Sequence, residues 1–95
     1  MPIVSKEELF GMVGQTVGTS DWLLVDQDRV NKFAEATGDF QFIHVDPEKA
    51  KLTPFGGPIA HGFLSLSLLP VLTAQANLPR LDGVKMGVNY GANKI

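Results

Sequence analysis

Residues 59–76 read IAHGFLSLSLLPVLTAQA and are apolar on nearly every side of a helix. A helix without a polar face is normally buried on all sides. Pro70 should kink this helix or limit it to about two to three turns, because its ring clashes with the carbonyl four residues earlier. The stretch therefore predicts a central buried helix that other elements must cover.

Two segments read as the strands that would cover this helix. Residues 17–25 (VGTSDWLLV) and residues 84–90 have strand-like patterns, and Trp22 is expected to face the core. Two strands cannot cover a helix that is buried on all sides. Either another chain supplies the missing strands, or these 95 residues are the front part of a longer domain. We favour the second, and expect residues 1–95 to be the N-terminal portion of one domain whose C-terminal strands are missing.

Two further helices have clear start signals. Asp26 is a good N-cap for residues 27–37, whose apolar side chains form one narrow stripe, and Gly38 supplies a left-handed end. Residues 46–48 (DPE) predict a second, short helix with a cap, a proline in its first position and an acid in its first turn. Residues 53–58 (TPFGGP) then form a loop.

The composition is that of an ordinary globular protein. The chain is 44% hydrophobic with a net charge of −2, and without a basic stripe we expect no nucleic-acid partner. The absence of cysteine excludes disulfides and cysteine metal sites. There is no signal-peptide pattern, and the most apolar run, residues 63–72, is too short to span a bilayer. We therefore expect a cytoplasmic protein that has no membrane partner.

Residues 36–44 (ATGDFQFIH) place the carboxylate of Asp39 five residues before the imidazole of His44. Both groups can contact one water, so that one accepts its proton while the other orients it or delivers a proton elsewhere. Phe40, Phe42 and Ile43 would supply a dry wall that strengthens the electrostatics. Spacing alone leaves a non-catalytic alternative open, in which Asp39 only caps a helix and His44 is a structural or surface histidine.

The dipeptide His61-Gly62 is the second candidate. It opens the apolar helix, so its backbone amides are among the unpaired donors of a helix N-terminus and can stabilise a developing oxyanion. Gly62 lacks a Cβ and would let a ligand approach the backbone, although it could instead serve tight packing of helix against sheet. A metal site made of His44 and His61 with Asp39 or Asp46 lacks any H-x3-H or H-E-x-x-H spacing, so we expect no metal.

Taken together, three motifs resemble a known family. Residues 33–48 (FAEATGDFQFIHVDPE), 58–63 (PIAHGF) and 88–91 (VNYG) are similar to the MaoC-type (R)-specific enoyl-CoA hydratases, especially the nodulation-protein-N-like branch with its motif G-D-x-Q-x-I-H-x-D-P. The resemblance covers nearly the whole chain from about Val17. In the wider family an Asn-Pro pair precedes the position before the histidine, and Gln41-Phe42 stand in its place here.

The resemblance implies a fold and an assembly. Members of this family have the hot-dog fold, an α+β fold in which an antiparallel sheet wraps around a long central helix, usually assembled as a homodimer. This agrees with the interpretation of residues 59–76. Family members continue for three more long strands after the one near Val84, so the resemblance implies that this chain is truncated after its second strand.

The resemblance also implies a reaction. Asp39 and His44 match the catalytic pair that activates the water added across the 2,3 double bond of a trans-2-enoyl-CoA, with Asp39 as the base and His44 orienting the water and passing a proton toward C2. Gly62 matches the position whose backbone N–H binds the thioester oxygen. No metal or redox cofactor is implied, because the thioester itself acidifies C2. The residues expected to bind the acyl-CoA substrate are Phe40, Gln41, Phe42, His61 and Phe63.

Two other functions stay open. A hot-dog thioesterase would bind acyl-CoA and hydrolyse it, and a truncated chain could be a non-catalytic fragment or interaction module. The position of the Asp39–His44 loop before the central helix favours hydration.

Overall fold

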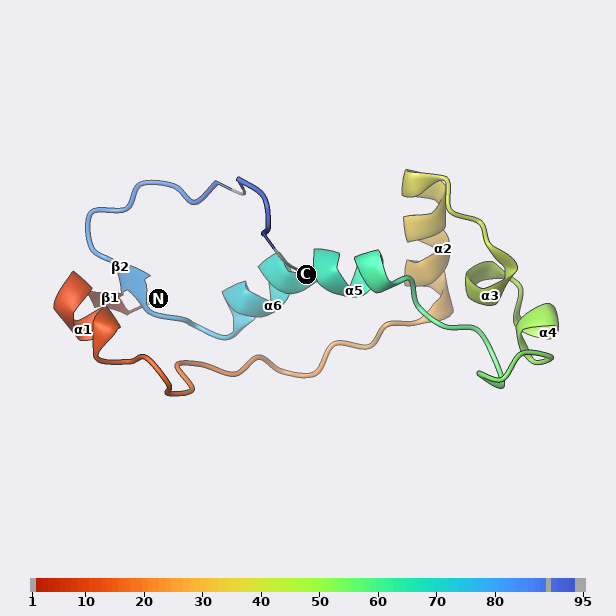
Figure 1. The fold of residues 1–95 in the computed structure, drawn as a ribbon, viewed down its shortest axis with the longest axis horizontal. Helices are drawn as coiled ribbons and strands as arrows, with labels where there is room; N and C mark the ends of the chain where they lie inside the picture. The colour runs from red at the N-terminus through yellow and green to blue at the C-terminus, as the bar shows by residue number, and fades with distance from the viewer. Residues whose placement is uncertain (1, 89, 94–95) are drawn as a thin grey trace.

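The computed structural model describes residues 2–88 and 90–93, which form an elongated molecule of 53 × 23 × 23 Å (Figure 1). In chain order its elements are β1 (Ile3–Val4), α1 (Lys6–Phe10), α2 (Gln27–Thr37), α3 (Phe42–Val45), α4 (Pro47–Ala50), α5 (Gly62–Ser67), α6 (Leu69–Gln75) and β2 (Arg80–Leu81). Helices α5 and α6 join one end, which holds α1 and the strands, to the other end, which holds α2, α3 and α4 (Figure 1). The mixture of helices and strands confirms the predicted α+β class at this coarse level.

The sheet differs from the prediction. Strands β1 and β2 pair in parallel, with Ile3 opposite Arg80 and Val4 opposite Leu81. The antiparallel sheet is therefore not formed by the described residues, and neither residues 17–25 nor residues 84–88 form a strand. A strand is stable only when its backbone N–H and C=O groups pair with a neighbouring strand, and these segments have no such neighbour in the described part of the chain. Asn89 of the third motif lies outside the described residues.

Helix α2 has the predicted bounds. The Asp26 carboxylate accepts a hydrogen bond from the Arg29 N–H at 2.9 Å, and Gly38 is left-handed, with φ 81°. Val30 and Ala34 are buried on one face. The predicted cap of the next short helix is also confirmed, because the Asp46 carboxylate accepts a hydrogen bond from the Lys49 N–H at 3.2 Å at the start of α4.

The predicted central helix is divided and only partly buried. It runs as α5 and α6 with a break at Leu68, because Pro70 has no N–H to donate to the Leu66 carbonyl. Leu64 and Leu68 are buried with Val30 of α2, whereas α6 buries none of its described residues. The prediction of burial on all sides is wrong for this structure, because α2 covers one face of α5 and the described residues form no sheet over the others.

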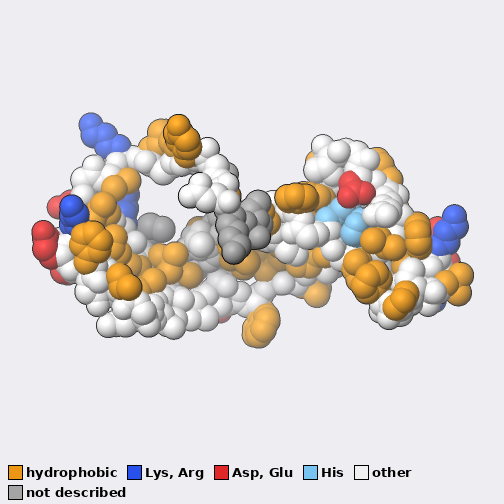
Figure 2. All heavy atoms as spheres, in the orientation of Figure 1, with side chains coloured by type: hydrophobic (Ala, Val, Ile, Leu, Met, Phe, Trp, Pro, Cys, Tyr) orange, Lys and Arg blue, Asp and Glu red, His pale blue; other side chains and the backbone are white. Residues whose placement is uncertain are grey.

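Much apolar surface is exposed. In Figure 2 apolar side chains are spread over the visible face, and Trp22, predicted to face the core, is fully exposed. The segment that carries Trp22 passes close to the end of α6, since a Cβ on Gly18 would lie 2.5 Å from the Ala76 carbonyl oxygen. Within the described residues, no helix combines the length and the apolar character needed to cross a membrane.

Candidate active site

Asp39 lies directly after the left-handed residue that ends α2. Its Oδ1 accepts a hydrogen bond from the Gln41 N–H at 3.3 Å, a local turn that is typical of aspartate. Its Oδ2 lies 4.0 Å from Nε2 of His61, and the side chain is 51% exposed. One carboxylate oxygen is therefore held inside the loop while the other lies beside the His61 ring, and about half of the side chain is exposed.

His44 is fixed by neighbouring elements on two sides. Its ring is buried on α3, and Nδ1 lies 2.8 Å from the Ile59 carbonyl oxygen. A carbonyl oxygen only accepts, so Nδ1 carries the hydrogen and Nε2 is the nitrogen that can gain or lose a proton. The Ile59 N–H also donates to the Ile43 carbonyl at 2.9 Å, and the Gln27 side chain of α2 donates to the His44 carbonyl at 2.7 Å.

His61 is more deeply buried, at 3% exposure. Its Nε2 donates to the Asp39 main-chain carbonyl at 3.0 Å. Its Nδ1 is buried and has no hydrogen-bond partner among the described residues, an arrangement that costs about 1–3 kcal/mol. Its ring stacks on His44, with centroids 3.9 Å apart and planes 23° apart, and contacts Phe33 at 4.9 Å between centroids.

The structure thus brings Asp39, His44 and His61 together. A carboxylate oxygen of Asp39 and one ring nitrogen of each histidine lie within 4.8 Å of one another, and the two histidines lie side by side in Figure 2. Two atoms at such a separation can both hydrogen-bond one water. A separation of this size leaves room for one water between a carboxylate and an imidazole, and the activation of such a water by Asp39 and His44 stays a prediction.

The same three residues could in principle hold a metal ion, but the stacking opposes it. An imidazole lone pair lies in the plane of its ring, so the lone pairs of two stacked rings whose planes are 23° apart lie in two separate, nearly parallel planes. A shared ion needs donors that converge on one point. The donor set fits hydrogen bonding to a small polar molecule better than a metal.

Gly62 is the first residue of α5, and a Cβ added there would meet nothing within 4 Å. Tight packing, the alternative explanation of this glycine, is therefore not needed here. Phe40 and Phe42 are 57% and 43% exposed and Ile43 is half-buried, so the two phenylalanines do not form the dry wall predicted around the loop. Phe63, a predicted substrate contact, is 71% exposed. Gln41 is also exposed, and its carbonyl accepts the His44 N–H at 3.0 Å.

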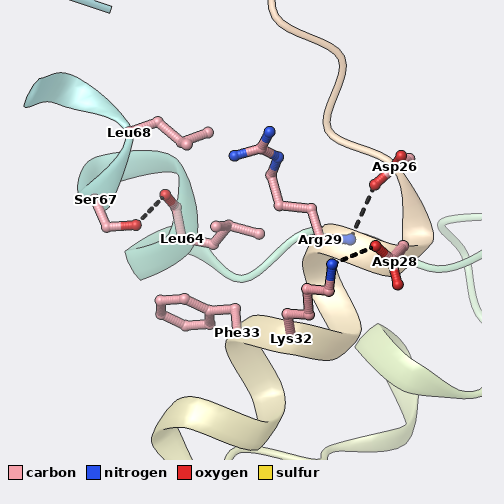
Figure 3. Close-up of a pocket in the computed structure, with 8 residues that line it drawn as sticks. All are labelled: Asp26, Asp28, Arg29, Lys32, Phe33, Leu64, Ser67 and Leu68. Atoms are coloured by element: carbon pink, nitrogen blue, oxygen red, sulfur yellow. Dashed lines mark hydrogen bonds and ion pairs between the residues drawn. The ribbon is translucent and has the colours of Figure 1, made fainter. Parts of the chain in front are cut away.

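A hollow of about 480 Å³ lies between α2 and α5 (Figure 3). It is lined by Asp26, Asp28, Arg29, Lys32, Phe33, Leu64, Ser67 and Leu68. The Asp28 carboxylate hydrogen-bonds Lys32 at 2.9 Å and so raises the pKa of that amine. None of the predicted site residues lines this hollow, although Phe33 contacts both it and the His61 ring.

Sequence reasoning missed what the His61 side chain does. The sequence suggested backbone donation and substrate contact at this position, whereas the ring bonds to a carbonyl 22 residues earlier. No spacing rule predicts a contact between segments so far apart. The only signal was indirect, namely that the motif at residues 58–63 and the loop at residues 36–44 both carry polar groups beside apolar helices.

Comparison with known proteins identifies the family. The MaoC like domain matches residues 9–95, and the chain therefore belongs to the MaoC-like family, as the sequence motifs indicated. The 3-hydroxyacyl-thioester dehydratase Z of Mycobacterium tuberculosis is 52% identical over 91 residues, which are 96% of this chain and 59% of that protein. Nodulation protein N of Rhizobium meliloti is 47% identical over 93 residues, which are 97% of this chain and 57% of that protein.

This chain thus spans less than two thirds of the length of these relatives. Among solved structures, protein af1124 of Archaeoglobus fulgidus is similar at 23% identity, with a TM-score of 0.47 over 82% of this chain and 56% of that protein.

Proposed function

We propose that this chain carries the water-activating part of a hydro-lyase that converts trans-2-enoyl-CoA into (R)-3-hydroxyacyl-CoA and catalyses the reverse dehydration. The observation that carries the proposal is the meeting of Asp39 and His44, with donor and acceptor atoms inside the span of one bridging water. Membership of the MaoC-like family and the similarity to a 3-hydroxyacyl-thioester dehydratase support the same reaction class.

In the proposed reaction the water oxygen bonds to C3 as Asp39 accepts a water proton. His44, protonated at Nε2, donates that proton to C2, so the product gains one hydroxyl and one hydrogen on the same face. Transfer of the proton from Asp39 to Nε2 of His44 then restores the starting state. The Nδ1–H bond to the Ile59 carbonyl is the same with or without a proton at Nε2, so the ring need not rotate during this cycle.

The electrons released from the double bond collect on the thioester oxygen. We propose that the Gly62 N–H, in the first turn of α5, donates to this oxygen. A donor held in place before the reaction stabilises the transition state more than the substrate, and removal of one such donor typically costs about 3 kcal/mol. The thioester supplies the electron sink, and the proposal includes neither a metal nor a redox cofactor.

The exposed residues around the site complete the proposal. Phe40, Gln41, Phe42 and Phe63 are accessible at the ends of α3 and α5, where an acyl-CoA would contact them. His61 has too little exposed surface for extensive contact with such a substrate. The assembled form in the proposal is a homodimer, since a second copy would cover part of the exposed apolar surface.

Hydration of crotonyl-CoA by the full-length protein tests the proposal. We expect the (R)-3-hydroxy product, and we expect Asp39→Asn and His44→Ala each to lower kcat by about 10²- to 10⁴-fold, the range of a general acid or base. Asp21→Asn is the matched control, because it makes the same change on an exposed carboxylate in the segment before α2 and should leave kcat unchanged.

Two results would contradict the proposal. Near-wild-type hydration by a folded Asp39→Asn or His44→Ala variant would show that the pair does not activate water. Release of free CoA without formation of a hydroxyacyl product would instead assign the chain to the thioesterases.

A further inference from the structure

We infer that His61 is a positioning residue of the proposed active site, and that its Nε2–H holds Asp39 in place through the Asp39 main-chain carbonyl. The inference rests on the proposed function of Asp39 and His44. It changes the expected role of His61, which the sequence placed among the substrate-binding residues.

The hydrogen bond from His61 to the Asp39 carbonyl joins two segments that are 22 residues apart in the sequence. Asp39 follows α2 and its carboxylate has one local restraint, the Gln41 N–H at 3.3 Å. The Nε2–H of His61, at the entrance of α5, holds the carbonyl of the same residue at 3.0 Å. Because this bond fixes the main chain of Asp39, it fixes the point from which the carboxylate extends, with Oδ2 4.0 Å from Nε2 of His61.

The ring of His61 also fixes the second member of the pair. It lies against His44, with centroids 3.9 Å apart, and is supported by Phe33 of α2. The Nδ1–H bond to Ile59 limits rotation of the His44 ring within its plane, and the stack limits tilting out of that plane. Together the two restraints define the direction in which Nε2 of His44 points.

A purely structural role would be served better by an apolar ring. Phenylalanine would fill a similar space and stack on His44, and it would not bury the unpaired Nδ1 that the imidazole leaves behind. What imidazole adds at this position is the donor at Nε2. The donor goes to the residue that the proposed reaction uses as its base.

Two substitutions separate the donor from the ring. His61→Phe keeps an aromatic ring and loses the donor, whereas His61→Gln keeps an N–H donor at the matching distance from the backbone and loses the ring. If His61 positions Asp39, His61→Phe lowers kcat for crotonyl-CoA hydration by about 10- to 100-fold with KM within about threefold, although its stability is unchanged or raised. His61→Gln then keeps a higher kcat than His61→Phe, even if it is less stable.

A structural role predicts the opposite order, with His61→Phe close to the wild type and His61→Gln the poorer enzyme, and that result would overturn the inference. Amide hydrogen exchange gives a readout that does not depend on activity. Loss of the anchor should raise exchange of the Gln41 N–H and leave the Arg29 N–H, at the other end of α2, unchanged. Unchanged exchange at Gln41 in a folded His61→Phe variant would also refute the inference.

If His61→Phe does not fold, the kcat of His61→Gln tests the inference by itself. Its kcat should stay within about tenfold of the wild type, and a loss as large as that of Asp39→Asn would overturn the inference. The Asp39→Asn and His44→Ala variants show which claim has failed. If they remain active, the proposed function is wrong; if they are inactive while both His61 variants match the wild type, the failure is confined to His61.

Discussion

Two backbone carbonyls set the orientation of the two imidazoles in the candidate site. His44 donates to the Ile59 carbonyl, which leaves its Nε2 available for the proposed proton transfer. His61 donates to the Asp39 carbonyl, which leaves its Nδ1 without a hydrogen-bond partner among the described residues. Neither bond needs a charged partner. The main chain therefore fixes which nitrogen of each ring carries the hydrogen whenever that ring is neutral, and it moves only if α3 or the entrance of α5 moves.

The open space beside Gly62 predicts that Gly62→Ala changes the activity of the protein without changing its fold. Gly62→Ala should leave stability unchanged or raise it by up to about 1 kcal/mol, because the added methyl meets nothing and alanine favours the helix. The same methyl should obstruct the thioester oxygen on its way to the Gly62 N–H and lower kcat/KM for crotonyl-CoA by about 10- to 100-fold. Steady-state kinetics and urea unfolding measure the two effects.

Gly57→Ala is the control for this prediction, because Gly57 also has open space around a hypothetical Cβ and lies in a loop away from the helix entrance. Its kcat/KM should match the wild type. Equal activity of Gly62→Ala and Gly57→Ala would remove Gly62 from the proposed oxyanion site.

For single residues, the sequence predicted contacts between side chains that are close together along the chain. Asp39 and His44 are five residues apart beyond a glycine that ends a helix, and so short a loop can bring both side chains to one point. The bond from His61 to Asp39 was not predictable, because it depends on how α5 approaches the end of α2. The exposure of Phe40 and Phe42 was missed for a similar reason, since a side chain is buried only if another element packs over it.

Among the elements, α2 and α4 followed their capping signals because those signals are satisfied by the neighbouring residues. The Asp26 and Asp46 carboxylates each bond an N–H three residues later, without any contribution from distant segments. Residues 17–25 and 84–88 have strand-like patterns, but no strand of the described part of the chain lies beside them, and they form no sheet there. Helix signals are therefore sufficient in this chain, whereas strand signals are not.

Pro70 determines where the apolar helix breaks, and its replacement should join α5 and α6. Pro70→Ala restores an N–H that can donate to the Leu66 carbonyl and removes the ring that clashes with it. We expect one helix over residues 62–75, with higher helicity by circular dichroism and a gain of about 1–3 kcal/mol in the free energy of unfolding. Pro79→Ala, outside the helices, should leave helicity unchanged. A Pro70→Ala variant with wild-type helicity would show that packing, not proline, sets the break.

On the scale of the whole molecule, the chain is too extended to bury its apolar side chains. Its radius of gyration is 17.8 Å, whereas a compact domain of this length has a value of about 12 Å. The buried apolar cluster consists of Val30, Leu64 and Leu68, and it occupies only the contact between α2 and α5. The sequence predicted a helix that two strands cannot cover, and the described residues do not supply that cover.

This exposure predicts self-association, the test of the proposed homodimer. Isolated chains should sediment as dimers or larger species, because contiguous apolar surface favours association. The single tryptophan, Trp22, is fully exposed in one chain, so its fluorescence should shift to the blue as protein concentration rises if association covers it. Trp22→Ser should weaken association, whereas Lys51→Ala, on the exposed surface after α4, should not. A chain that remains monomeric at all concentrations, with unchanged emission from Trp22, would show that this apolar surface does not bind a second copy.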